Sequence, residues 1–290
     1  MLISNHRLLI KDPQASLDFY QNVLGMTLVH QTETEQSQHY FLSFAEPQQA
    51  SLELVNMPDA DFSVAAQPNA EEGYWKFSIA VPSLEATHAG LVKRGVAAGD
   101  CFNIAGLAYL CHFNDPNGYS IELVQQRLFE HSPPLSEELL AATTIQPVAK
   151  GATFNLSTLR VKDANHSLAF YQSLGMELVY RYRSDARAMT LYFLVFKDDE
   201  AYQQLKQSPN IAEALWQYPA TVLELQQFDG TELNSNFAYQ VGPQTGFLGL
   251  DIYRGLSHSS IGQQRFQLDA KQVPVETLID PDGYVIRCFD

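Results

Sequence analysis

The chain contains one stretch twice, first as Lys11-Asp12-Pro13, Ser16-Leu17-Asp18-Phe19-Tyr20-Gln21 and Leu24-Gly25-Met26. The second copy reads Lys162-Asp163, Ser167-Leu168-Ala169-Phe170-Tyr171-Gln172 and Leu174-Gly175-Met176. Asp12 and Asp163 are 151 positions apart, as are Tyr20 and Tyr171, so this part of the repeat aligns without a gap. A repeat of this length indicates that the chain is built from two related halves.

A second pair of matching segments lies near the ends of the halves. Asp115-Pro116-Asn117-Gly118-Tyr119-Ser120-Ile121-Glu122 is matched by Asp280-Pro281-Asp282-Gly283-Tyr284-Val285-Ile286-Arg287. Pro presets φ and Gly permits a positive φ, so Asp-Pro-x-Gly predicts a turn, and the alternating residues after it predict a strand. We therefore expect domains at 1–128 and 152–290, joined by a linker over 129–151 that contains a helix after Ser136.

Each half is itself double. The first half predicts a strand at 4–10, a helix at 12–24 and strands near 26–32, 38–45 and 50–56. The order then recurs as a strand at 74–81, a helix at 83–95 and strands near 99–103, 107–113 and 118–125. The second half repeats the first unit with a helical insertion at 197–218, and its last unit has a Gly- and Ser-rich segment at 253–264 in place of a helix. The predicted class is α+β, with four βαβββ units, two in each half.

Composition limits the classes of partner. The chain has 290 residues, 46% of them hydrophobic, and a formal net charge of −15. Such an acidic surface argues against nucleic acid and against anionic membranes, and is compatible with a small-molecule ligand. No apolar run reaches the roughly 20 residues that span a bilayer. The three cysteines form no CxxC pair, which predicts reduced thiols and a cytoplasmic location.

These motifs resemble the vicinal oxygen chelate superfamily, and within it glyoxalase I (lactoylglutathione lyase). The resemblance is best at 11–28, 51–54, 79–82 and 106–123. It implies that pairs of βαβββ units form curved mixed sheets around cups. It also implies that a divalent metal (zinc or nickel) at the base of a cup acts on a small hemithioacetal as a Lewis acid.

Carried onto this chain, the metal-ligand positions of the family are Asn5, Glu53, Lys76 and Glu122 in the first half, and Leu156, Glu224, Phe247 and Arg287 in the second. Strand parity supports this placement for Glu53, Lys76 and Glu122, whose neighbours in sequence form the apolar faces of their strands. The family usually has His or Gln at the first position and His at the third. The ammonium group of a lysine has no lone pair for a metal, so Lys76 departs from that pattern.

The sequence leaves open whether units pair within a half or across the halves. Under either scheme each cup contains Lys76 or Arg287 together with at least one Glu, and we hypothesise that this cation replaces the metal. Arg7 and Arg160 have cup-facing parity, so each is a substrate-binding candidate or part of a structural salt bridge. His6, His39 and His112 are interpreted as core or surface residues, because no two have the spacing of a metal-binding pair.

Four functions follow from this set of residues. The first is a glyoxalase-type lyase with Glu122 as proton shuttle. In this function any metal is held by Asn5, Glu53 and Glu122. The substrate is bound by Arg7, Lys76, Arg160, Glu224 and Arg287. The second is a metal-free ligand-binding protein of the bleomycin-resistance type. The third is metal-free catalysis, in which Lys76 polarises a carbonyl and Glu53 or Glu122 removes a proton. An extradiol dioxygenase ranks last, because Asn5 and Lys76 stand where it needs His. Four units in one chain are compatible with a monomer or a homodimer.

Overall fold

The computed structural model describes residues 1–44, 49–65, 70–145, 148, 151–197, 200–255 and 273–290. The first unit consists of β1 (Leu2–Ile10), α1 (Pro13–Asp18), the π-helical turn η1 (Phe19–Val23), β2 (Thr27–Glu33), β3 (Gln38–Ser43) and β4 (Ser51–Asn56). The second consists of β5 (Tyr74–Val81), α2 (Leu84–Lys93), β6 (Phe102–Ile104), β7 (Ala108–Asn114) and β8 (Ser120–Gln125). Both have the predicted βαβββ order.

Between the second and third units the chain forms a short turn, η2 (Phe129–His131), and α3 (Glu137–Ile145). The third unit is β9 (Thr153–Arg160), α4 (Ala164–Ser173), β10 (Met176–Ser184), η3 (Asp185–Arg187), β11 (Met189–Phe196) and β12 (Val222–Phe228), with α5 (Glu200–Gln207) and α6 (Ile211–Trp216) inserted. After η4 (Thr231–Leu233) and η5 (Pro243–Thr245), the last unit contributes β13 (Phe247–Tyr253), β14 (Glu276–Ile279) and β15 (Val285–Phe289). The α+β class and the helical insertion are confirmed, whereas most of the Gly- and Ser-rich segment at 253–264 lies outside the described residues.

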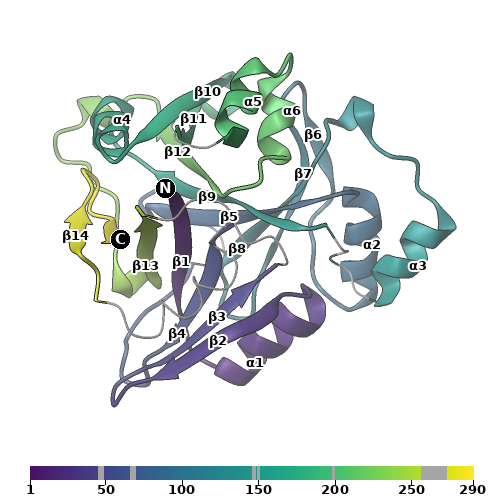
Figure 1. Ribbon diagram of the computed structural model, residues 1–290, viewed down its shortest axis with the longest axis horizontal. Helices are drawn as coiled ribbons and strands as arrows, with labels where there is room; N and C mark the ends of the chain where they lie inside the picture. The colour runs from purple at the N-terminus through teal and green to yellow at the C-terminus, as the bar shows by residue number, and fades with distance from the viewer. Residues whose placement is uncertain (45–48, 66–69, 146–147, 149–150, 198–199, 256–272) are drawn as a thin grey trace.

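The strands form two mixed sheets, and each sheet takes one unit from each half (Figure 1). The first sheet has the order β14-β15-β13-β1-β4-β3-β2, and the second β10-β11-β12-β9-β5-β8-β7-β6. The halves join where β1 pairs antiparallel with β13, and where β5 pairs antiparallel with β9. The pairing that the sequence left open is therefore across the halves.

The two repeated motifs contact each other, which explains why they recur together. The Tyr20 hydroxyl donates a hydrogen bond to Asp115 Oδ2 at 2.9 Å, and the Tyr171 hydroxyl donates one to Asp280 Oδ2 at 2.9 Å. In the turn after Asp115, Gly118 has a φ of +100°, a conformation that only glycine adopts without strain. Because each tyrosine follows a strand of one sheet and each aspartate precedes a strand of the other, both contacts tie the two sheets together.

The main core lies between the sheets and encloses His6. Its ring is surrounded by those of Tyr74, Phe77, Phe154 and Phe247, with centroids 5.1–5.6 Å away. Complete burial lowers the pKa of His6 to about 3, so the imidazole is neutral. It points away from the cups, as its parity predicts. Among the described residues, no helix has the length and apolar character that crossing a membrane requires.

Candidate functional site

The candidate site lies on the second sheet, where Lys76 is buried between two glutamates. Lys76 Nζ lies 2.9 Å from Glu122 Oε1 on β8 and 3.3 Å from Glu224 Oε2 on β12. It also donates to Thr158 Oγ1 at 3.2 Å and more weakly to Ser78 Oγ at 3.4 Å. Lys76 is 2% exposed, so the ammonium charge is neutralised by the protein and not by water. The structure therefore places a fixed cation at the base of this cup.

Glu122 has both oxygens engaged. Oε1 accepts from Ser78 Oγ at 2.6 Å as well as from Lys76, and Oε2 lies 3.0 Å from His112 Nε2 on β7. Since an ionised carboxylate only accepts, this contact makes Nε2 of His112 the donor. Glu224 Oε2 accepts from Thr158 Oγ1 at 3.1 Å, and Glu224 Oε1 accepts from Gln226 Nε2 at 2.5 Å.

The charges in this cluster hold one another in the ionised state. Burial alone would raise the pKa of Glu122, but the Lys76 ammonium and the His112 hydrogen bond outweigh it and hold that pKa well below its usual value. Burial alone would lower the pKa of Lys76, but Glu122 and Glu224 outweigh that effect and raise it. Lys76 therefore stays protonated, which suits a charge-stabilising role and does not suit a nucleophilic amine.

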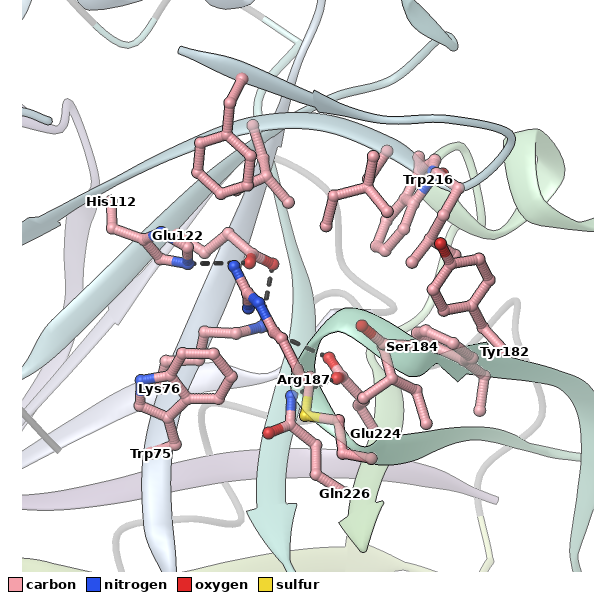
Figure 2. A pocket seen from close by; sticks show the side chains of 18 residues that line it. Trp75, Lys76, His112, Glu122, Tyr182, Ser184, Arg187, Trp216, Glu224 and Gln226 are labelled. Atoms are coloured by element: carbon pink, nitrogen blue, oxygen red, sulfur yellow. Dashed lines mark hydrogen bonds and ion pairs between the residues drawn. The ribbon is translucent and has the colours of Figure 1, made fainter. Parts of the chain in front are cut away.

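The cluster forms one end of a pocket with a mostly apolar lining (Figure 2). We call it the Lys76 pocket; its apolar lining includes Ile104, Leu107, Leu110, Met189, Leu191 and Phe193. The insertion that carries α5 and α6 supplies Trp216, whose Nε1 donates to the Leu107 carbonyl at 2.6 Å and whose ring packs edge-on against Phe193. The inserted helices therefore fix one wall of the pocket.

Trp75 also lines the Lys76 pocket, although strict alternation along β5 predicts that this neighbour of Lys76 lies on the opposite, apolar face of the strand. The register of β5 against β9 advances from Tyr74↔Leu159 to Lys76↔Thr158, so Trp75 is the extra residue of a β-bulge. A bulge interrupts strict alternation, which brings Trp75 and Lys76 to the same cavity.

The corresponding place on the first sheet is filled by ion pairs. Glu53 accepts from Arg7 Nε at 3.0 Å, from His39 Nδ1 at 2.8 Å and from Arg287 at 3.3 Å. Asp251 accepts two hydrogen bonds from Arg287, at 2.7 and 2.6 Å. Burial alone would raise the pKa of Glu53, but Arg7, His39 and Arg287 together outweigh burial and lower that pKa to about 2. This cluster pairs two arginines with two carboxylates.

At three of the predicted quartet positions, the structure sets a different residue next to the carboxylates. On β1 the residue paired with Glu53 is Arg7 and not Asn5. On β9 the residue paired with Glu224 is Thr158 and not Leu156. Leu156 belongs to an apolar cluster with residues such as Val124 and Phe193. Asn5 donates to Asp251 Oδ2 at 2.9 Å, and its Oδ1 has no hydrogen-bond partner among the described residues.

Phe247 is the third. It stacks on Tyr74 in the core, with centroids 4.3 Å apart, and Asp251 contributes the buried acid of β13 instead.

The structure gathers the other predicted residues at different places. Lys76, Glu122 and Glu224 meet in the Lys76 pocket, whereas Arg7 and Arg287 meet Glu53 on the other sheet. Arg160 does not line the pocket. Its guanidinium lies over the rings of Trp75 and Phe228, 5.3 and 5.4 Å from their centroids, and donates to the Glu72 carbonyl.

Sequence reasoning missed His39 and His112 as site residues. Each lies on the strand next to a predicted glutamate, and His112 is directly opposite Glu122 in the register of β7 and β8. The available signal was this hairpin register, because cross-strand neighbours depend on pairing and not on spacing along one strand.

The donor atoms at neither site fit a divalent metal. In the Lys76 pocket the ammonium group already sits between the two carboxylates, and on the first sheet two guanidinium groups surround Glu53. Lysine and arginine in these states offer no lone pair and repel a cation. Across the described ranges, no three His, Cys, Asp or Glu side chains come together in a group that would hold a metal ion.

Comparison with known proteins agrees with the fold and the duplication. The model of the Glyoxalase/Bleomycin resistance protein/Dioxygenase superfamily matches residues 3–123. The lactoylglutathione lyase of Schizosaccharomyces pombe is 26% identical over 316 aligned positions, which cover 99% of this chain and 95% of that protein. The probable lactoylglutathione lyase of Vibrio cholerae is 32% identical over 142 positions, which cover 43% of this chain and 94% of that protein.

Solved structures show the same architecture. The crystal structure of glyoxalase I from Zea mays superposes with a TM-score of 0.65 at 17% identity, covering 100% of this chain and 92% of that one. The fold and the fused duplication define a glyoxalase-like chain. The protein belongs to the Glyoxalase/Bleomycin resistance protein/Dioxygenase superfamily.

Proposed function

We propose that this glyoxalase-like protein takes a small carbonyl or hemithioacetal-type substrate into the Lys76 pocket and acts on it without a divalent metal. The observation that carries the proposal is the position of Lys76 Nζ, buried within hydrogen-bond distance of both Glu122 and Glu224 at the base of an apolar pocket. Relatives named lactoylglutathione lyase support the substrate class.

The chemistry assigned to these residues is a proton transfer next to a carbonyl. Negative charge that develops on the carbonyl oxygen is stabilised by the Lys76 ammonium, whose effect is strong because the site excludes water. Glu122 Oε2, which His112 alone contacts among the described residues, takes the proton from the carbon beside the carbonyl and returns it to the carbonyl carbon, while the proton of the adjacent hydroxyl passes to the former carbonyl oxygen. The donor to the oxyanion and the proton acceptor then lie on adjacent strands, β5 and β8.

A second candidate is a protein that binds its ligand without turning it over. It is favoured by the saturation of the cluster, since Lys76 Nζ already has four acceptors and both oxygens of Glu122 are hydrogen-bonded. Burial raises the pKa of Glu122, but Lys76 and His112 lower it further than burial raises it. The resulting low pKa makes the Glu122 carboxylate a weak base.

The test uses full-length protein purified without added metal. Turnover of the methylglyoxal–glutathione hemithioacetal is measured with and without EDTA, alongside zinc and nickel content. We expect turnover that EDTA leaves unchanged and that Glu122→Gln abolishes, whereas Glu138→Gln, an exposed change in the linker helix, leaves it intact. Saturable binding without turnover supports the second candidate. Activity that EDTA removes and zinc or nickel restores contradicts metal independence.

A further inference from the structure

Two polar groups that line the Lys76 pocket, the Arg187 guanidinium and Gln226 Oε1, have no hydrogen-bond partner among the described residues. Arg187 lines the pocket from η3, is exposed, and none of the described residues forms a hydrogen bond or ion pair with its guanidinium. Gln226 lines the pocket from β12 and is 1% exposed, and its Oε1 is buried with no hydrogen-bond partner among the described residues. A buried acceptor without a donor is costly, so it points to a partner that this chain does not supply.

The orientation of the Gln226 amide is fixed by its neighbour. Its Nε2 donates to Glu224 Oε1 at 2.5 Å. Turning the amide over would place two acceptor oxygens against each other, because an ionised carboxylate has no proton to give. Oε1 is therefore the atom left for the ligand, and it accepts from a hydroxyl or N–H group.

The strand register places Gln226 on β12 two residues beyond Glu224, toward the end of β11 that follows η3. On β11, Phe193 is opposite Glu224 and Leu191 is opposite Gln226, and η3 directly precedes the start of this strand. In Figure 2 the Arg187 side chain points into the pocket. Arg187 and Gln226 therefore line the same pocket, one from the turn before β11 and one from β12, and both face a ligand bound there.

We infer that the Lys76 pocket selects a carboxylic acid with an apolar body, whose carboxylate binds Arg187 and whose hydroxyl or N–H group donates to Gln226 Oε1. This inference rests on the proposed function only in taking the pocket as the ligand site. An arginine fork suits a carboxylate because it can form two parallel charged hydrogen bonds. The apolar wall of Leu191, Phe193 and Trp216 receives the body of the ligand.

The ion cluster itself would repel the same carboxylate. Lys76 is shared between Glu122 and Glu224, so the cluster holds one cation and two carboxylates. A third carboxylate there would add like charge in a site that water does not screen. The acid group of the ligand is therefore directed to Arg187, and a neutral group faces Lys76.

The two tryptophans of the chain, Trp75 and Trp216, both line the pocket, so their fluorescence reports binding directly. The probes are 3-phenyllactate, its uncharged amide, and 3-phenylpropanoate, which lacks the hydroxyl. We expect 3-phenyllactate to bind roughly tenfold more tightly than either of the others, as a charged hydrogen bond and a satisfied buried acceptor predict.

Arg187→Gln should remove the preference for the acid over the amide, and it should not disturb folding because Arg187 is exposed. Arg181→Gln is the matched control: Arg181 is an exposed arginine on β10 that does not line the pocket. Gln226→Leu should remove the preference for the hydroxyl. Equal affinities for acid and amide, or an unchanged preference in Arg187→Gln, overturn the inference and leave the pocket as a ligand site. Failure of all three compounds to bind overturns the inference and also counts against the proposed ligand site.

Discussion

Lys76 Nζ lies 2.9 Å from Glu122 Oε1, and the two residues come from adjacent parallel strands of a sheet to which both halves of the chain contribute. The same nitrogen is 3.3 Å from Glu224, which belongs to the other half. This cation therefore joins the two units that build the cup. It also satisfies, from within the protein, the carboxylates that would otherwise need a bound metal.

Replacing Lys76 by Met should destabilise the protein strongly, because it leaves two carboxylates buried without a counter-charge. Breaking a buried pair in this way costs about 3–5 kcal/mol of unfolding free energy. Chemical denaturation measures it, with the exposed Lys93→Met as control. Adding Glu122→Gln to Lys76→Met should recover part of the loss. A loss below about 1 kcal/mol would show that the pair is not desolvated as described.

The ion cluster on the first sheet should stabilise the fold without affecting the ligand. Arg287→Met removes the two short hydrogen bonds to Asp251, which is fully buried, and should cost about 1–3 kcal/mol of unfolding free energy. The affinity of the Lys76 pocket for 3-phenyllactate should change by less than about twofold, since distant sites act independently. A large loss of affinity in this variant would mean that the two sheets share one site.

Stability should fall in acid partly through Glu53. The pKa of Glu53 is about 2 in the folded protein, whereas an unperturbed glutamate, as in the unfolded chain, has a pKa of 4.5. The unfolded chain therefore takes up the proton first as the pH falls. The contribution of Glu53 is therefore fully present above about pH 4.5 and is lost toward pH 2, up to about 3 kcal/mol. Urea unfolding of the wild type and of Glu53→Gln between pH 6 and pH 3 checks this. Equal slopes for the two proteins would contradict it.

Much of this arrangement is readable from the sequence, since both repeats and strand parity depend on residues close together in the chain. Parity correctly set Lys76, Glu53 and Glu122 opposite the apolar faces of their strands. It failed at Trp75, because a β-bulge adds a residue that no pattern of alternation reveals.

Features that depend on strand pairing could not be predicted. The cross-half pairing of β1 with β13 brings Asp251 beside Asn5, and nothing in the sequence of β13 marks Asp251 as a site residue. His112 reaches Glu122 through the β7–β8 register in the same way. Gln226 and Arg187 become visible only when the pocket that contains them is built.

The central claim is that Lys76 occupies the place of a metal, and a zinc titration of two proteins tests it most directly. The wild type is compared by calorimetry with Lys76→His, which removes the fixed cation and adds a ligand nitrogen beside Glu122 and Glu224. We expect no stoichiometric zinc binding by the wild type and a gain of one site in Lys76→His. Tight, stoichiometric binding of zinc by the wild type that Glu122→Gln abolishes would contradict the account.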